Sequence, residues 1–199
     1  DRPYSVVETL LKEQGMRHPN LARLEGTALV VIDMQEKLLA AMQRREAVAD
    51  NVGRLVRLAR ILALPVVLTE QYARGLGTTV PAVRDALVEC QPFEKTAFSC
   101  FLVDGFVDHV AQLGVKPVLL AGVEAHVCVS QTSLDAISRG YQAHVLADCI
   151  SSRTDENYRL GIQKIRAAGA VISSLEIAIY EMLERSSTPA FQEAQPLLK

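Results

Sequence analysis

Residues 117–139, read as PVLLAGVEAHVCVSQTSLDAISR, join an apolar run to a helical pattern through a short turn. The run stops at Gly122, and apolar residues recur at helical spacing from Cys128 onward. A buried strand that leads into a helix in this way places the turn at the end of a sheet, where ligands of open α/β sheets bind. Unpaired N–H groups and the dipole at a helix start stabilise a thiolate. We therefore expect the rest of the chain to hold and serve a reactive Cys128.

Apolar stretches of strand length alternate with stretches of helical spacing along most of the chain. Parallel strands need crossover helices between them, so this alternation predicts an α/β fold with a parallel sheet covered on both faces. The expected strands are residues 27–33, 64–69, 92–96, 117–121, 142–146 and 171–173. The expected helices are residues 47–63, 80–88, 102–113, 126–139, 155–168 and 174–183, and loops are expected at residues 70–81 and 147–152.

The two ends of the chain are expected to lie outside this alternation. Residues 1–26 would form a helix at 5–14 and a connector, residues 27–185 the α/β domain, and residues 186–199 a polar tail. Three apolar residues of the tail have no expected element to pack on, so we expect them to contact a neighbouring chain: Phe191, Leu197 and Leu198.

The composition excludes several classes of protein. With 199 residues, 49% of them hydrophobic, the chain can form one sizeable core and fits a single domain. A net charge of −2 without a basic stripe disfavours a nucleic-acid partner. The longest apolar runs are only of strand length, so no membrane span is expected. The charged start, DRPYSVVETLLKEQG, has no apolar region of the kind found in a secretory signal.

The four cysteines give no sign of a metal site or a disulfide framework. None belongs to a C-x-x-C pair, and no histidines cluster with them. We therefore expect free thiols, a reducing cytoplasmic setting and no bound metal. Three of the four are expected to be packing residues or bystanders: Cys90, Cys100 and Cys149.

Three reactive side chains stand at or just after the ends of expected strands: Asp33, Lys95 and Cys128. Because the carboxyl ends of parallel strands meet at one edge of the sheet, these groups would converge on one crevice. A carboxylate, an ammonium and a thiol there make a plausible base, electrostatic helper and nucleophile. Each also has a structural interpretation, as a turn residue, a solvated lysine and a packed cysteine. Spacing alone leaves both interpretations open.

Three segments resemble the isochorismatase-like cysteine hydrolases: ALVVIDMQEKL around Asp33, FEKTAFSCF around Lys95 and LLAGVEAHVCVSQTSLDAISRGY around Cys128. The resemblance runs over residues 27–183. TEQYARGLGTTVPAV and the tail STPAFQEAQPLLK are most similar to the subgroup called isochorismatase domain-containing proteins. The resemblance implies a three-layer α/β/α sandwich with a six-stranded parallel sheet in the order 3-2-1-4-5-6. It also implies a homo-oligomer, either a dimer, a tetramer or a larger ring.

The same resemblance implies a mechanism. Asp33, Lys95 and Cys128 would form the catalytic triad, and a cis peptide bond would join Val123 to Glu124. That bond would aim the backbone N–H of Glu124, together with that of Cys128, at an oxyanion. The implied activity is hydrolysis of a small amide-like C–N bond through a Cys128 thioester, with Asp33 as base and then acid and Lys95 as helper. The alternative is a small-molecule-binding or scaffold protein that keeps the fold without turnover.

Departures from the family pattern narrow the activity. Nicotinamidases carry a metal site of Asp and His after the second strand, but residues 69–79 read TEQYARGLGTT, so we expect no metal or other cofactor. Isochorismatases proper lack the cysteine, so Cys128 argues against that activity. A nucleotide-dependent oxidoreductase is disfavoured because Gly75-Leu76-Gly77 lacks the third glycine of a dinucleotide fingerprint.

Other residues near the expected crevice have weaker signals. Four either line the substrate pocket or serve loop structure and packing: Gln35, Gln71, Tyr72 and Phe98. His126 lies two residues before Cys128, a spacing that does not aim both side chains at one target, so we expect a structural or pocket-edge role. Glu124 would contribute its backbone rather than its carboxylate. Cys149, Ser151 and Ser152 would border the site or an interface.

Overall fold

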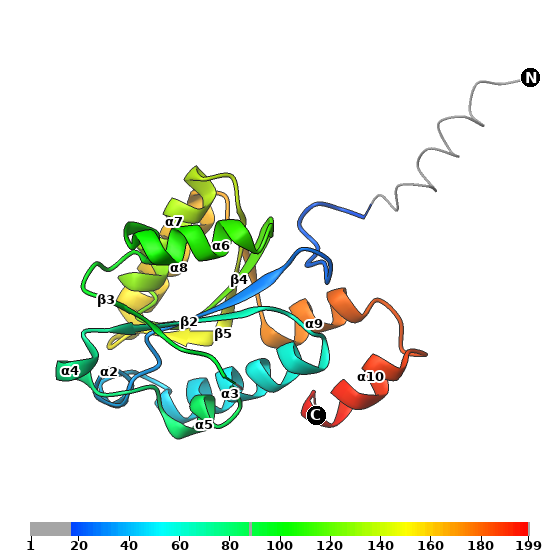
Figure 1. The fold of residues 1–199 in the computed structure, drawn as a ribbon, viewed down its shortest axis with the longest axis horizontal. Helices are drawn as coiled ribbons and strands as arrows, with labels where there is room; N and C mark the ends of the chain where they lie inside the picture. The colour runs from blue at the N-terminus through cyan, green and yellow to red at the C-terminus, as the bar shows by residue number, and fades with distance from the viewer. Residues whose placement is uncertain (1–16, 88, 199) are drawn as a thin grey trace, which may run out of the picture.

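The structure is a computed structural model that describes residues 17–87 and 89–198. Within these residues, six strands form one parallel sheet in the order β3-β2-β1-β4-β5-β6 (Figure 1). The predicted fold class and strand order are confirmed, and the helix expected at residues 5–14 lies outside the described part of the chain. The strands are β1 Ala28–Ile32, β2 Val66–Gln71, β3 Phe93–Lys95, β4 Pro117–Val123, β5 Gln142–Ser151 and β6 Val171–Ser173.

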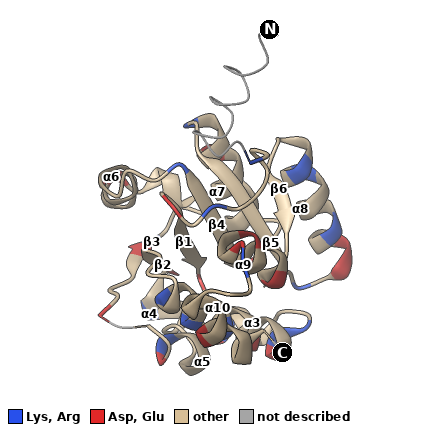
Figure 2. Ribbon diagram, turned by 90° about the vertical axis from the view of Figure 1, so that its right-hand side faces the viewer, with Lys and Arg blue, Asp and Glu red and all other residues tan. Residues whose placement is uncertain are grey.

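Helices cover both faces of the sheet, as Figures 1 and 2 show. One core contains α3, α5, α9 and α10, and the other contains α6, α7 and α8. The helices are α2 Glu36–Ala40, α3 Arg45–Ile61, α4 Ala73–Leu76, α5 Pro81–Arg84, α6 Asp104–Gln112, α7 Cys128–Ser138, α8 Asp155–Ala167, α9 Leu175–Leu183 and α10 Pro189–Ala194, with 3-10 turns η1 Cys100–Leu102 and η2 Gln195–Leu197. No helix in the described ranges is both long and apolar enough to cross a membrane.

The central strands β1 and β4 are buried along their whole length. Their side chains alternate between the two cores: Leu29 and Val31 enter one, and Ala28, Val30 and Ile32 enter the other. Burial on both faces explains why these strands read as unbroken apolar runs in the sequence. It also places the residues that follow β1 and β4 at the middle of the carboxyl edge of the sheet.

The prediction of a loop at residues 147–152 is wrong, because β5 continues to Ser151. Its second half pairs with the end of β4, where Gly122 lies opposite Ile150 after a shift of register. The polar Asp148 interrupts the apolar pattern, but its side chain accepts a hydrogen bond from the Leu175 N–H at 2.8 Å and so holds the start of α9. The loop expected at residues 70–81 is also partly wrong, since β2 runs to Gln71 and α4 follows.

The tail packs on its own chain. Phe191, Leu197 and Leu198 lie against the core of the α3 face, and Arg54 on α3 donates from Nε to the Leu197 carbonyl at 2.9 Å. The expectation that these three residues lack a core of their own is therefore wrong. The error arose because the apolar pattern of α3 shows that one face of this helix is buried, but not which segment covers it. Part of that face packs against α10, far along the chain.

His144, on β5, is fully buried, and neither of its ring nitrogens has a hydrogen-bond partner among the described residues. Burial lowers the pKa of His144, and the charge of Glu181 opposes this only in part. The folded protein therefore holds this imidazole neutral under conditions where the unfolded chain takes up a proton.

We expect the free energy of unfolding to fall as the pH drops below about 7, through the ordinary histidine pKa of about 6.5. The lowered folded-state pKa means that stability is full above this range and is lost below it. Urea unfolding measured across this range tests the expectation: His144→Leu should flatten the dependence, whereas substitution of the exposed His18 by Gln should leave it unchanged. Parallel curves for the wild type and His144→Leu would contradict it.

Candidate active site

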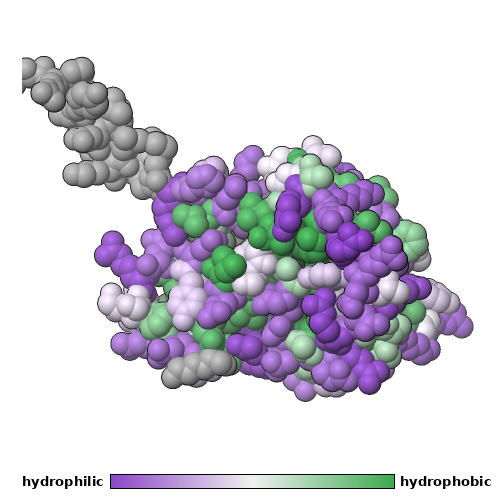
Figure 3. Space-filling view, turned by 180° about the vertical axis from the view of Figure 1, so that it is seen from behind, coloured by the Kyte–Doolittle hydropathy of each residue, from purple (hydrophilic) through white to green (hydrophobic). Residues whose placement is uncertain are grey.

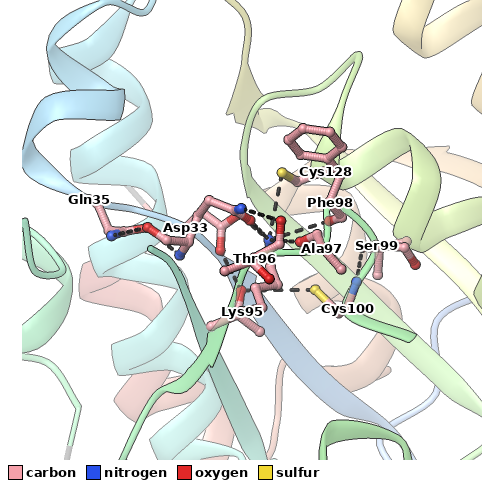
Figure 4. A network of polar contacts seen from close by, with 12 residues as sticks. Asp33, Gln35, Lys95, Thr96, Ala97, Phe98, Ser99, Cys100 and Cys128 are labelled. Carbon is pink, nitrogen blue, oxygen red and sulfur yellow. Dashed lines mark hydrogen bonds and ion pairs between the residues drawn. The ribbon is translucent and has the colours of Figure 1, made fainter. Parts of the chain in front are cut away.

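Three side chains from separate elements meet at the carboxyl edge of the sheet (Figure 4). Asp33 follows β1, Lys95 ends β3 and Cys128 begins α7. Lys95 Nζ lies 2.6 Å from Asp33 Oδ2 and 3.7 Å from Cys128 Sγ. The side chains of Asp33 and Lys95 are fully buried, and Cys128 is 6% exposed. The structure thus brings together the carboxylate, the ammonium and the thiol that were predicted to converge.

The backbone of Asp33 leaves the strand conformation. Its φ of 52° lies in the left-handed region, which Asp tolerates better than most residues. Its N–H still donates to the Thr69 carbonyl on β2 at 3.1 Å, and its own carbonyl accepts from the Gln35 N–H at 2.7 Å. The first bond ties the turn to the sheet and the second closes the turn itself, so the carboxylate is fixed at the sheet edge.

Lys95 is held by several oxygen atoms besides Asp33. Nζ donates to Gln71 Oε1 at 2.6 Å and approaches the carbonyls of Ala97 and Phe98 at 3.3 Å each. Burial is the largest influence and disfavours the charged ammonium, but the charge and hydrogen bond of Asp33, together with Cys128 and Cys100, outweigh it and raise the pKa of Lys95. Lys95 is therefore a permanent positive charge at neutral pH.

The thiol of Cys128 is protonated in the resting site. Burial, followed by the charge and hydrogen bond of Asp33, raises the pKa of Cys128 to about 12, although Lys95 acts in the opposite direction. The sequence predicted that the helix start stabilises a thiolate; in the folded protein, burial and the charge of Asp33 favour the neutral thiol. Cys128 can become a nucleophile only if a neighbouring base accepts its proton, and Asp33 is in place to do so.

The turn between β4 and α7 has an unusual backbone. The peptide bond between Val123 and Glu124 is cis. The Glu124 carbonyl accepts from the N–H groups of Val127 and Val129 at 3.0 and 3.2 Å. Among the hydrogen bonds of the described residues, none uses the N–H of Glu124 or of Cys128. These are two backbone donors beside the thiol that lack protein acceptors.

Gly122 lets the two central strands approach each other before this turn. Its φ is +119°, and a Cβ added there would lie 1.9 Å from the Ile32 carbonyl oxygen. Any side chain would therefore collide with the backbone of β1 one residue before Asp33. A glycine at this position keeps the carboxylate and the turn within reach of each other.

Glu124 and His126 point their side chains toward the loop after β5 rather than toward the thiol. Although burial opposes its ionisation, hydrogen bonds and charge from Arg153 hold the pKa of Glu124 below its ordinary value. Arg153 Nε donates to Glu124 Oε2 at 2.9 Å, and His126 Nδ1 lies 3.0 Å from Ser152 Oγ. These contacts assign Glu124 and His126 to bracing the turn. Cys149 is fully buried in the core.

Of the four residues expected near the pocket, two are exposed and two make hydrogen bonds within the site. Tyr72 and Phe98 are 55% and 52% exposed, and the Phe98 ring stands beside Cys128 in Figure 4. Gln71 contacts Lys95 as described above. Gln35 is fully buried, and its Nε2 donates to the carbonyls of Gln71 and Gly77 at 3.0 and 2.7 Å. Of the two roles left open for Gln35, these contacts support the structural one: it clamps the segment after β2.

One residue of the site escaped the sequence analysis. Thr69 on β2 donates from Oγ1 to Asp33 Oδ1 at 2.7 Å, and both side chains are buried. A signal was present, since Thr69 and Gln71 are two positions apart on one strand and therefore face the same side. An unbroken apolar run with a terminal threonine reads as the end of a strand, which hides such a role.

The segment after β2 does not gather metal ligands. Glu70, near the end of β2, has a carboxylate that accepts from the backbone N–H and the hydroxyl of Thr79 in this segment, both at 2.7 Å. Within residues 17–87 and 89–198, no three His, Cys, Asp or Glu side chains are grouped so that they could hold a metal ion.

Comparison with known proteins identifies the family of the chain. The chain is 38% identical over 184 residues to isochorismatase domain-containing protein 2 of Bos taurus, which covers 91% of this chain and 88% of the relative. It is 35% identical over 179 residues to a secreted isochorismatase effector of Phytophthora sojae, covering 87% and 85% of the two chains. A solved structure titled MAR1 ribonuclease from Caenorhabditis elegans superposes with a TM-score of 0.84 at 36% identity, covering 89% and 92%. Since residues 27–177 also match the isochorismatase domain, the chain belongs to the isochorismatase family.

Proposed function

We propose that the protein is a cysteine hydrolase that cleaves a small amide-like C–N bond through a thioester on Cys128. The observation that carries this proposal is the contact of a protonated thiol with a buried Asp–Lys pair. The family gives a hydrolase fold, and the two backbone N–H groups without acceptors add the donors that acyl transfer needs.

The first half-reaction forms the thioester. Asp33 takes the proton of Cys128 as sulfur attacks the substrate carbonyl carbon, so that no free thiolate has to exist beforehand. The carbonyl oxygen becomes an oxyanion and accepts from the N–H groups of Glu124 and Cys128, each donor typically contributing about 3 kcal/mol. The C–N bond then breaks, and Asp33 returns its proton to the departing amine. Lys95 keeps its charge throughout and favours the ionised forms of Asp33 and Cys128.

The second half-reaction releases the acid product. Water enters the space left by the amine and gives a proton to Asp33 as it attacks the thioester carbon. The same two N–H groups bind the second oxyanion. The C–S bond breaks, sulfur recovers the proton from Asp33, and the resting site with a neutral thiol is restored.

Selective labelling tests this proposal without knowledge of the substrate. We expect an amide-bearing electrophile to modify Cys128 faster than Cys90 by on the order of a hundredfold, because a positioned base assists only Cys128. Cys90 is the matched comparison: it is more exposed than Cys128, and burial also raises its pKa. Peptide mass spectrometry after short incubation measures both rates. Equal labelling, or faster labelling of Cys90, would mean that Cys128 is not activated.

A screen of small amides, carbamoyl compounds and ureides would then search for the substrate through the acyl adduct on Cys128. The absence of turnover in this screen, despite selective labelling, would favour a small-molecule-binding protein without relevant activity.

RNA belongs in the same screen because the Caenorhabditis elegans relative is titled a ribonuclease. The net charge of −2 argues against it, since nucleic-acid binding draws on positive charge. Figure 2 shows both signs of charge interspersed over the helices.

Assembly into a homo-oligomer and a cytoplasmic setting are further parts of the proposal. Apolar side chains gather among polar ones on the face seen in Figure 3. Helices α8 and α9 expose three large apolar residues that contact with a second copy of the chain would cover: Leu160, Ile177 and Tyr180. The mass of the native protein in solution decides between one chain and two or four.

A further inference from the structure

A chain of polar groups leads from the oxygen of Asp33 that does not contact Lys95. Thr69 Oγ1 lies 2.7 Å from Asp33 Oδ1, and Cys100 Sγ lies 3.9 Å from Thr69 Oγ1. All three residues are fully buried. They come from different elements, since Asp33 follows β1, Thr69 is on β2 and Cys100 begins η1.

The direction of each hydrogen bond follows from the groups. An ionised carboxylate only accepts, so the Thr69 hydroxyl must donate to Asp33. The hydroxyl oxygen is then left to accept from Cys100, whose pKa burial raises to about 11, so that its S–H proton is present at neutral pH. Cys100 is itself fixed on α7, because its N–H donates to Thr132 Oγ1 at 3.0 Å. The hydroxyl of Thr69 therefore has one orientation.

This orientation determines what each oxygen of Asp33 does. Oδ2 faces Lys95, and Oδ1 faces Thr69. The last torsion of an aspartate side chain is broad, so a carboxylate held at only one oxygen can turn. A second donor prevents that rotation, and it also favours the ionised carboxylate over the protonated acid.

We propose that Thr69 is a positioning residue that keeps Asp33 ionised and correctly turned to take the proton of Cys128, with Cys100 fixing the Thr69 hydroxyl. This inference rests on the proposed function. It gives a role to a buried thiol and a buried hydroxyl that the two half-reactions do not use.

The charged and titratable groups around Asp33 are Lys95 on β3, Cys128 on α7 and Cys100 on η1. Lys95 stays positive and both thiols stay neutral between about pH 4 and pH 8, because all three have raised pKa values. Within that range, a change in Cys128 reactivity with pH therefore reports on the carboxylate that accepts its proton, not on these three groups. Without the Thr69 donor, the ionised carboxylate loses a hydrogen bond that favours it, so the decrease in reactivity at low pH moves to higher pH.

The experiment measures Cys128 alkylation by iodoacetamide as a function of pH in Thr69→Val and Thr69→Ser. Valine matches threonine in shape but has no hydroxyl, whereas serine keeps it. The acid limb is the part of the profile in which the alkylation rate of Cys128 falls as the pH is lowered. In Thr69→Val we expect this limb to move to higher pH by roughly one unit, which is about a tenfold loss of rate at a given pH on the limb. In Thr69→Ser we expect the limb to stay at its wild-type position. A merely structural residue would alter unfolding without moving the limb.

The outcomes separate this inference from the proposed function. If wild-type Cys128 is not labelled selectively, the proposed function fails. If it is labelled selectively but Thr69→Val folds and keeps the wild-type limb, only the role of Thr69 is overturned. Should Thr69→Val fail to fold, Cys100→Ala leaves Thr69 and Asp33 in place and provides the test. It is expected to move the limb in the same direction by a smaller amount, and an unmoved limb would overturn the inference.

Discussion

Replacing Cys128 by Ala is expected to lower turnover by at least about 10⁴-fold while the protein remains folded. The loss follows because no covalent intermediate can form, and neither Asp33 nor Lys95 can supply a nucleophile in its place. The fold survives because Lys95 keeps its contacts with Asp33, Gln71 and two carbonyls when the sulfur is removed. The stability change should stay within about 1 kcal/mol, since one small buried atom is lost.

The measurements are steady-state turnover on whichever amide acylates the wild type, and thermal unfolding of both proteins. Cys90→Ala is the matched control, because Cys90 is a partly buried cysteine whose Sγ contacts the Val66 carbonyl far from the triad. That variant should keep wild-type turnover. Retained activity in Cys128→Ala would rule out the thioester, whereas loss of activity in Cys90→Ala would show that cysteine removal acts through stability instead.

The central part of the fold was predictable because its signal is local. β1 and β4 are buried on both faces, so apolar runs mark them without reference to the rest of the chain. The convergence of Asp33, Lys95 and Cys128 followed from strand ends and from the resemblance. Errors arose where one residue serves a distant element. Asp148 looks like a loop residue because its carboxylate holds the start of α9, 27 positions later.

The chemistry of the site was less predictable than its composition. The helix start at Cys128 suggested a thiolate, but burial raises the pKa of the thiol, and no sequence pattern reports how much water a thiol has lost. Gln35 and Thr69 also show that the sequence does not reveal which polar residues contact the triad. Gln35 is polar and near the triad, yet it binds backbone, whereas Thr69 is hidden in an apolar run and binds the triad itself. Pairings across the sheet decide both roles.

Replacing Asp33 by Asn is expected to remove both the base and the partner of a buried charge. Turnover should fall by on the order of 10³-fold or more, because an amide cannot take the proton of Cys128. Stability should also fall, by about 3 kcal/mol, since Lys95 Nζ would lose its ion pair in a position with no solvent access. The Thr69 hydroxyl can still donate to the amide oxygen, which turns the amide nitrogen toward the ammonium, donor against donor.

The double substitution Asp33→Asn with Lys95→Met separates these two effects. Methionine removes the charge at a similar length, so the double variant no longer buries an unpaired ammonium and should be more stable than Asp33→Asn alone, as measured by urea unfolding. It should remain inactive, because neither base nor helper is present. Equal stability of the single and double variants would show that the ion pair is not what Asp33 contributes to the fold. Turnover recovered in the double variant would place the base elsewhere, because removing Lys95 can relieve a stranded charge but cannot create a proton acceptor for Cys128.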